Sequence, residues 1–507
     1  MKLGSVNDDD DNNNKKNSND KTSLTIASPS PSPSSSSNHH RDVDVEKAAH
    51  HGGDGQGERN QGPTMMMMTT TVTSTTTYKV YKRRFWGLVQ LALLNLVISW
   101  GWLTFASIST STAEYFSVSE SAVNWLSTAT LFAFCVATPI VMYTLNKGGP
   151  KHAIVAASVL TLVGNWIRYA GARADGGIFG LVAFGQILIG LAQPFCLTAP
   201  TRYSDLWFSD RGRTSATALT TLANPLGAAL GELVDSLVVL QPSDVPNMVL
   251  YIAIISSVAC IPSFFIPARP PTPPSASSEV QKTPFIESVR QIVRVVEFWL
   301  IFIPFSIYVG FFNSVSALLN QILYPYGFSE TQAGIAGGLL ILVGLASSAI
   351  VSPLTDRFKH YLAVVRICVP VLAVLYIALI FAPPSVAGIA PTFVVCALLG
   401  ASSFSLLPVA LELLVEITYP FSPEIGSTLC WSGGQVLGAI FTIIQTALTA
   451  GPDASPPENM QNALIFSAVV AAVAVPFPLS LGLFGREVVH RRLEAETDIV
   501  DRRTTEV

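Results

Sequence analysis

Charged side chains are scarce in this sequence of 507 residues. Only 13% of the residues are Asp, Glu, Lys or Arg, about half the share that is usual for a soluble protein. The apolar share is 50% and the mean hydropathy is +0.45. Apolar runs of about 18 residues or more with almost no charge indicate transmembrane helices. The formal net charge of -4 argues against a protein that binds nucleic acid.

The residue patterns of catalytic and metal sites are also missing. The sequence contains no GxSxG, HExxH or P-loop motif, and we find no paired-carboxylate site. Its 6 cysteines all lie in apolar runs and form no CxxC pair, which disfavours zinc, redox chemistry and a disulfide framework. The sequence therefore predicts neither an enzyme nor a bound cofactor or metal.

Apolar runs divide most of the chain into twelve predicted spans, six on each side of a polar, Pro-rich segment. The predicted spans are roughly 85–113, 121–146, 152–173, 177–201, 214–240, 246–267, 298–324, 331–355, 361–382, 390–415, 425–450 and 461–485. Two halves of six helices are typical of the major facilitator fold, whose halves are related by a pseudo-two-fold axis and hold the substrate between them at mid-membrane. We therefore expect an all-α integral membrane protein of that fold.

The same pattern predicts five segments along the chain. Residues 1–77 are rich in Asp, Asn, Ser, Pro and Thr, so we expect a disordered tail. The expected order after this tail is an N-terminal bundle at 78–267, a linker at 268–296, a C-terminal bundle at 297–485 and a second tail at 486–507.

The basic residues give these spans a direction. With a cytosolic N-terminus, nearly every Lys and Arg between the spans falls on an inner segment, and only Arg168 and Arg173 fall on outer ones. Both tails are then cytosolic. We expect the protein itself to lie in the plasma membrane or in a vacuolar or lysosomal membrane. We interpret Arg168 as a residue whose side chain reaches the membrane interface.

Several segments, taken in order, resemble one branch of the major facilitator superfamily. They are NWLS at 124–127, LNKGGPK at 145–151, GNWIR at 164–168, LAQPF at 191–195, LLNQ at 318–321, EITYP at 416–420 and GQVLG at 434–438. Over about 83–486 the chain resembles the feline-leukaemia-virus subgroup C receptor-related family. The resemblance implies transport of small organic solutes, with choline and ethanolamine as the best-supported substrates and haem as a disputed one.

The resemblance extends to two loops that the superfamily uses for gating. Residues 145–151 are similar to the signature loop between the second and third helices, with Lys147 and Gly148 in place but Asn146 where an aspartate is usual. The matching loop of the second half keeps its acid, as Asp356 and Arg357.

The resemblance also implies a substrate site between the halves. Trp102, Gln193 and Gln435 align with residues that line the family's cavity. An aromatic ring suits a quaternary ammonium group because the ring face attracts a cation. Trp100 is a second candidate, but two residues two positions apart lie about 200° apart on a helix, so only one of the two indoles can face the cavity. Packing against lipid or protein is the alternative for both indoles, and interhelical hydrogen bonding is the alternative for the two glutamines.

One position departs from the family. The family's second aromatic residue, in the span at 298–324, aligns with Asn313 here. The two-sided aromatic cage thus becomes a pair of Trp102 and Asn313, unless Phe312, Tyr308 or Tyr324 substitutes. An amide offers hydrogen bonds, so it suits a hydroxylated or primary amine better than a bare trimethylammonium group.

Charged residues inside the spans mark candidate coupling sites. Glu232, Asp235 and Glu412 are carboxylates in predicted spans, and such groups suggest proton coupling or cation attraction. All three are predicted within a turn or two of a membrane interface, where water is available. Glu232 is the strongest of them as a functional residue.

Glycine spacing predicts where helices approach closely. Three GxxxG pairs occur, at Gly227/Gly231, Gly334/Gly338 and Gly434/Gly438. In the superfamily the fifth helix packs on the eighth, and the second on the eleventh.

Three functions remain open at this point. The first is a monomeric transporter of a small organic amine or cation that works by alternating access, and the second is an exporter of haem or another amphiphile. The third is a membrane receptor or sensor that does not transport. Haem is the weaker of the two solutes because all seven histidines fall in tails or loops: His39, His40, His50, His51, His152, His360 and His490.

Overall fold

The computed structural model describes residues 79–272, 285–385, 388–418 and 423–482, and these are helical with no strand. The predicted tails at 1–77 and 486–507 lie outside the described residues, as does part of the predicted linker. The bounds predicted for the five segments of the chain stay a prediction.

The first group of helices contains these elements: α1 (Arg84–Leu103), α2 (Ser109–Phe116), α3 (Glu120–Gly148), α4 (Pro150–Arg173), α5 (Phe179–Trp207), α6 (Asp210–Leu230), η1 (Gly231–Asp235), α7 (Ser236–Val238), η2 (Pro242–Asp244), α8 (Val245–Cys260) and η3 (Ile261–Phe265). The second group contains α9 (Phe285–Ile292), α10 (Val296–Leu323), η5 (Tyr324–Tyr326), α11 (Glu330–Phe358), α12 (Tyr361–Phe381), α13 (Ala390–Thr418), α14 (Pro423–Ala447), α15 (Gln461–Ala474) and α16 (Pro476–Ser480).

Eleven of the twelve predicted spans coincide with helices that are long and apolar enough to cross a membrane. The remaining span, predicted at 214–240 and fifth along the chain, is formed by α6, η1 and α7 in succession. It is less apolar because it carries several threonines and the carboxylates Glu232 and Asp235. Its regular winding is also interrupted, since η1 is a five-residue π-helix.

The first predicted span ends earlier than expected. We predicted one uncharged span over 85–113, but α1 ends at Leu103 and a short separate helix, α2, follows a turn. The run Ser109-Thr110-Ser111-Thr112 explains the break, because such side chains compete for backbone hydrogen bonds and favour helix starts over helix interiors.

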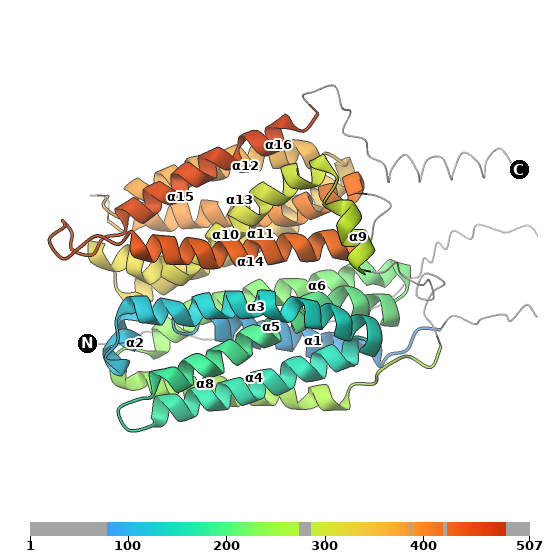
Figure 1. The fold of residues 1–507 in the computed structure, drawn as a ribbon, viewed down its shortest axis with the longest axis horizontal. Coiled ribbons are helices and arrows are strands. Elements are labelled where there is room, and N and C mark those ends of the chain that lie inside the picture. The colour runs from blue at the N-terminus through green and yellow to red at the C-terminus, as the bar shows by residue number, and fades with distance from the viewer. Residues whose placement is uncertain (1–78, 273–284, 386–387, 419–422, 483–507) are drawn as a thin grey trace, which may run out of the picture. The chain divides into compact units, whose positions relative to one another are not determined.

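The two groups of helices pack as separate bundles that lie side by side (Figure 1). Within the first group α4 packs on α5 and α8, and α1 packs on α6. Within the second group α11 packs on α13, and α10 packs on α14. The bundles meet through α3 against α14 and through α6 and η1 against α11. These are the second-on-eleventh and fifth-on-eighth pairings expected of the superfamily.

Two glycines of α11 permit its contact with the first bundle. Gly334 and Gly338 of α11 face Ser236 and Leu233, so the predicted close approach between the bundles is confirmed there. Gly227 instead faces the backbone of α1, within its own bundle.

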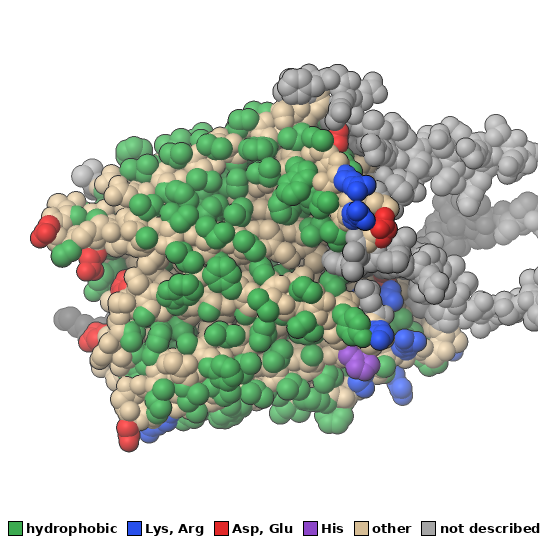
Figure 2. Space-filling model, viewed as in Figure 1, with side chains coloured by type: hydrophobic (Ala, Val, Ile, Leu, Met, Phe, Trp, Pro, Cys, Tyr) green, Lys and Arg blue, Asp and Glu red, His purple; other side chains and the backbone are tan. Residues whose placement is uncertain are grey.

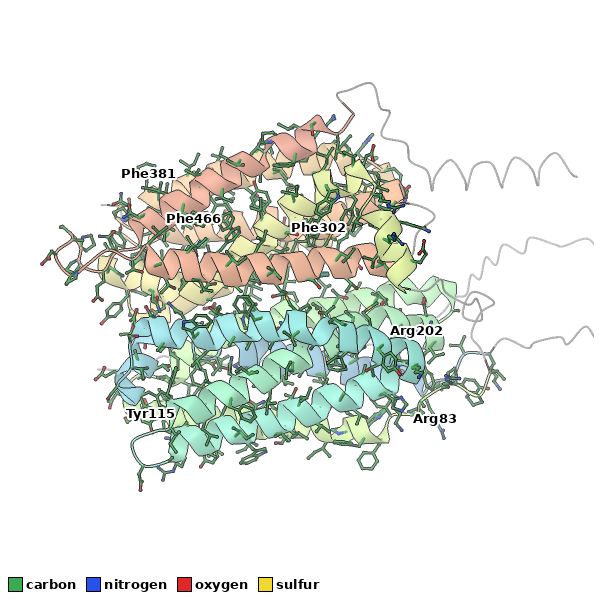
Figure 3. All side chains as sticks on the ribbon, in the orientation of Figure 1. Arg83, Tyr115, Arg202, Phe302, Phe381 and Phe466 are labelled. Atoms are coloured by element: carbon green, nitrogen blue, oxygen red, sulfur yellow. The ribbon has the colours of Figure 1, made fainter. Side chains whose placement is uncertain are left out.

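Charge differs between the two ends of the bundles (Figure 2). Lys and Arg gather where α1 begins and α3 ends, and Arg83 and Arg202 lie there in Figure 3. We call this the basic end. The opposite end holds α2, with Tyr115, together with the start of α3 at Glu120 and the start of α11 at Glu330. We call this the acidic end.

Candidate functional site

The indole of Trp102 lies between the two bundles. Trp102 is 4% exposed and belongs to an apolar cluster whose other members come mostly from α10 to α15. Its place is set by the end of α1, where Gln186 of α5 donates to the carbonyl oxygens of Gly101 (3.0 Å) and Trp102 (3.2 Å). Helix ends leave such carbonyls without a partner, so Gln186 fixes this end of the helix.

Two buried polar atoms of the predicted site have no hydrogen-bond partner among the described residues. One is the donor Nε1 of Trp102, and the other is the acceptor Oε1 of Gln193 in α5. Leaving a buried polar atom unpaired costs about 1–3 kcal/mol, so such atoms need an explanation. A polar solute with both a donor and an acceptor is one explanation.

Asn313 and Gln435 form a buried amide pair. The Nδ2 of Asn313 in α10 donates to Oε1 of Gln435 in α14 at 3.1 Å. A Cβ added at Gly438 would lie 2.9 Å from Cβ of Asn313 and 3.3 Å from Cδ1 of Leu131 in α3. This glycine therefore lets the amide pair approach the first bundle.

The aromatic residues that could replace the missing partner near Asn313 lie in different surroundings. Tyr308 donates to the carbonyl oxygens of Val369 and Ala471, inside the second bundle. Tyr324 is exposed in η5, at the acidic end. Phe312 packs edge-on against Phe404, with ring centroids 5.3 Å apart. Tyr308 thus bonds inside the second bundle and Tyr324 is exposed at the acidic end. Phe312 is the remaining aromatic candidate, next to Asn313.

Trp100 is engaged with a buried charge cluster. Its Nε1 donates to Oδ1 of Asp235 at 2.9 Å. Asp235 interacts electrostatically with Arg168, whose guanidinium group lies 4.8 Å from the ring centroid of Phe105. Nη1 of Arg168 also donates to the carbonyl of Gly101 at 3.3 Å.

Two interpretations of charged residues were wrong. Arg168 does not reach the membrane interface, because its side chain is 0% exposed and lies inside the first bundle. Glu232 and Asp235 are each 1% exposed, so they lack the water expected near an interface. Both errors have one cause: position along a span does not tell which face of the helix turns inward. Glu412, by contrast, is exposed.

A polar network joins the bundles at the acidic end. Ser111 in α2 donates to Glu330 in α11 through its backbone N–H (3.0 Å) and its hydroxyl (2.5 Å). Asn320 of α10 donates to Ser109 (3.0 Å) and Thr110 (3.2 Å). Thr110 in turn donates to Glu120 at 2.9 Å. We call these residues, with Asn124 and Gln321, the acidic-end network.

Asn124 and Gln321 complete the acidic-end network. Their amides exchange two hydrogen bonds, of 2.9 Å and 2.7 Å, and Asn124 also donates to Thr446 at 2.9 Å. These bonds hold the two bundles together at this end.

The sequence did not single out Ser109, Ser111 or Glu330. A usable signal was the repeated Ser-Glu pair at 119–120 and 329–330, where each serine caps a helix that enters the network.

The predicted gating loops lie at the basic end. Lys147 donates to the hydroxyl of Tyr143 at 2.8 Å, and the carbonyl of Gly148 contacts a ring nitrogen of His152 at 2.5 Å. Arg357 lies 5.9 Å from the ring centroid of Phe358. Asp356 falls within α11, but its side chain is outside the described residues. The gating role of these four residues stays a prediction.

Comparison with known proteins places this fold in a family. The model of the Major Facilitator Superfamily matches residues 91–452. A relative in Danio rerio, solute carrier family 49 member A3, is 33% identical over 83% of this chain and 91% of its own length. The choline/ethanolamine transporter FLVCR1 of Felis catus is 31% identical over 74% of this chain and 69% of its own length.

Solved structures agree on the fold. An inward-open structure of the xylose transporter XylE from E. coli covers 78% of this chain and 96% of its own, with a TM-score of 0.61 and 14% identity. The chain therefore belongs to the feline-leukaemia-virus subgroup C receptor-related family of the major facilitator superfamily, and it is a multi-pass membrane transporter of small molecules, not an enzyme.

Proposed function

We propose that this protein moves a small organic amine, such as ethanolamine or choline, across a membrane by alternating access. The observation that carries the proposal is a set of buried polar groups: the unpaired Nε1 of Trp102 between the bundles, the unpaired Oε1 of Gln193, and the Asn313–Gln435 amide pair. A hydroxylated amine can donate to the amide oxygens, accept from the indole N–H and place its cation on the aromatic ring.

The names of relatives support the same solute class. FLVCR1 of Felis catus is called a choline/ethanolamine transporter. The haem alternative gains nothing from the described histidines, His152 and His360, because both lie at the basic end and neither can ligate iron between the bundles. No observation made on the described residues favours a receptor without transport.

We further propose that the basic end faces the cytosol, since Lys and Arg accumulate on the cytoplasmic side of membrane proteins. The acidic-end network then closes the outer side, and the site opens toward the cytosol when the bundles part at the basic end. This is one of the two states that alternating access requires. We expect the protein to act as a monomer, in the plasma membrane or a vacuolar or lysosomal membrane.

Uptake into proteoliposomes tests the proposed function. We expect the purified protein to accumulate labelled ethanolamine or choline above the level of empty vesicles. Replacing Trp102 with alanine removes the ring and its N–H, so we expect uptake to fall about tenfold or more, in line with about 0.5–2 kcal/mol for the ring contact plus a lost hydrogen bond. Trp125→Ala is the matched control, because Trp125 is 53% exposed on α3. Absence of uptake of both amines would overturn the proposed solute class.

Selectivity tests the role of Asn313. Replacing it with tyrosine places an aromatic ring where this chain has an amide, so we expect uptake of choline to rise relative to uptake of ethanolamine. A ring contact of about 1 kcal/mol corresponds to a change of about fivefold in the ratio. Competition between the two labelled amines in one vesicle preparation measures that ratio. An unchanged ratio would show that Asn313 does not contact the amine.

A further inference from the structure

Among the described residues, no positive charge is found beside the carboxyl group of Glu232. Glu232 is 1% exposed, and its Oε1 has no hydrogen-bond partner among the described residues. It lies in η1, the π-helical break in the span predicted at 214–240, and such breaks occur frequently at functional sites. A buried ionised carboxylate without a partner is very costly, and a buried acid avoids that cost by holding a proton.

This carboxyl group lies against the other bundle. A Cβ added at Gly337 of α11 would lie 2.8 Å from Cδ of Glu232 and 2.9 Å from its Oε2. Next to it, Thr331 of α11 donates to the carbonyl of Ser236 at 3.1 Å. Glu232 is therefore enclosed only while α11 rests on η1, and separation of the bundles at the acidic end uncovers it.

Among the described charged and titratable groups around Glu232, it is the acid whose charge no positive group offsets. On its own element it interacts with Asp235, which is offset by Arg168 of α4 and by the indole N–H of Trp100. Cys396 of α13 also interacts with it electrostatically. Glu330, at the start of α11, is bound to Ser111 and Asn320 in the acidic-end network. The glycine face of α11 that packs on η1, formed by Gly334, Gly337 and Gly338, carries no charge.

We propose that Glu232 is a proton-binding site whose occupancy sets the position of the two bundles. The protonated carboxyl is compatible with the closed acidic end, in which α11 covers it. Loss of the proton leaves a charge between α11 and η1, and this charge favours the arrangement in which the bundles part at the acidic end and water reaches the carboxylate. The proposal rests on alternating access but not on the identity of the solute.

Spin-label distances across the acidic end test the proposal without any solute. Glu114 on α2 and Asp453 in the loop after α14 are exposed and belong to different bundles, so cysteines at these positions carry the labels. Cys135 and Cys368, which are only partly buried, are replaced with alanine in this background. Distances are measured by pulsed electron paramagnetic resonance in lipid nanodiscs from acidic to alkaline pH.

We expect a single short distance at acidic pH and a longer second distance that grows at alkaline pH. One proton changes the ratio of open to closed molecules by at most about tenfold per pH unit. Glu232→Gln keeps the shape of the protonated acid and removes the charge, so we expect it to stay closed at every pH. Glu232→Asp, which keeps the acid, retains the response.

Two outcomes would overturn the proposal. One is a full pH response in Glu232→Gln that matches the unsubstituted protein, and the other is a response that disappears in Glu330→Gln while Glu232→Gln keeps it. The second outcome would assign the titration to the acidic-end network. Elution volume and thermal stability identify variants that do not fold, and the aspartate variant then supplies the comparison. Because no amine is present, neither outcome changes the result of the uptake experiment.

Discussion

Replacing Gly334 with leucine is expected to abolish closure of the acidic end and with it most of the transport. A Cβ at this position meets the backbone carbonyl of Glu232 and the hydroxyl of Ser236, and a backbone cannot move aside as a flexible side chain can. Overpacking costs about 1–3 kcal/mol, which shifts a two-state equilibrium by about fivefold to about 150-fold toward the separated bundles. Uptake of labelled amine and the spin-label distances at the acidic end measure the two consequences.

Gly180→Leu is the matched control for this prediction. Gly180 lies in α5 and an added Cβ meets nothing within 4 Å, so the same side chain finds open space there. We expect this variant to transport as the unsubstituted protein does. If Gly334→Leu also kept full uptake, the contact of α11 with η1 would not be part of the transport cycle.

Removing the carboxyl group of Asp235 is expected to destabilise the first bundle strongly. Asp235→Ala leaves Arg168 as an uncompensated charge at 0% exposure, and breaking a buried charge pair in this way costs about 3 kcal/mol or more. It also deprives the indole N–H of Trp100 of its acceptor. Thermal unfolding in detergent measures the loss as a lower midpoint temperature.

The double variant Arg168→Met/Asp235→Ala separates charge from shape. Because it removes both charges, we expect it to recover part of the stability that Asp235→Ala loses. Asp453→Ala, in an exposed loop, should leave the midpoint unchanged. A double variant less stable than either single variant would mean that the two charges do not compensate each other.

The number and order of the spans followed from the sequence because burial in a bilayer leaves a direct mark on composition. Runs without charge predicted eleven helices near their observed bounds, and α6, η1 and α7 together form the remaining span, predicted at 214–240. The break between α1 and α2 was missed, since both segments are uncharged and only the hydroxyl-rich run at Ser109 indicates it.

The buried charges could not be placed from sequence for a physical reason. Arg168 and Glu232 sit near the ends of their spans, where a charge can equally reach water or turn into the bundle. The inward orientation of each side chain depends on residues that are distant in the sequence. These are Phe105 and Asp235 for Arg168, and the glycine face of α11 for Glu232. Neither partner is adjacent in the chain, so no local pattern records it.

The candidate substrate site was predictable only through resemblance. Composition gave no reason to prefer Gln193 over another intramembrane glutamine, and Gln186 in fact holds the end of α1. The Asn313–Gln435 bond joins α10 to α14 and depends on the close approach at Gly438, which spacing within one helix does not reveal. Contact of these residues with substrate stays a prediction that the uptake experiments test.

A reversible cross-link across the acidic end tests the central claim, that transport needs the two bundles to part and rejoin there. Cysteines at Ser111 and Glu330, whose side chains now bond across the bundles, are joined with a short thiol-reactive linker that a reductant cleaves. We expect uptake of labelled ethanolamine into proteoliposomes to stop on cross-linking and to return on reduction, while either single cysteine variant is unaffected by the reagent. Uptake that continues at full rate through the cross-linked protein would contradict alternating access at this end.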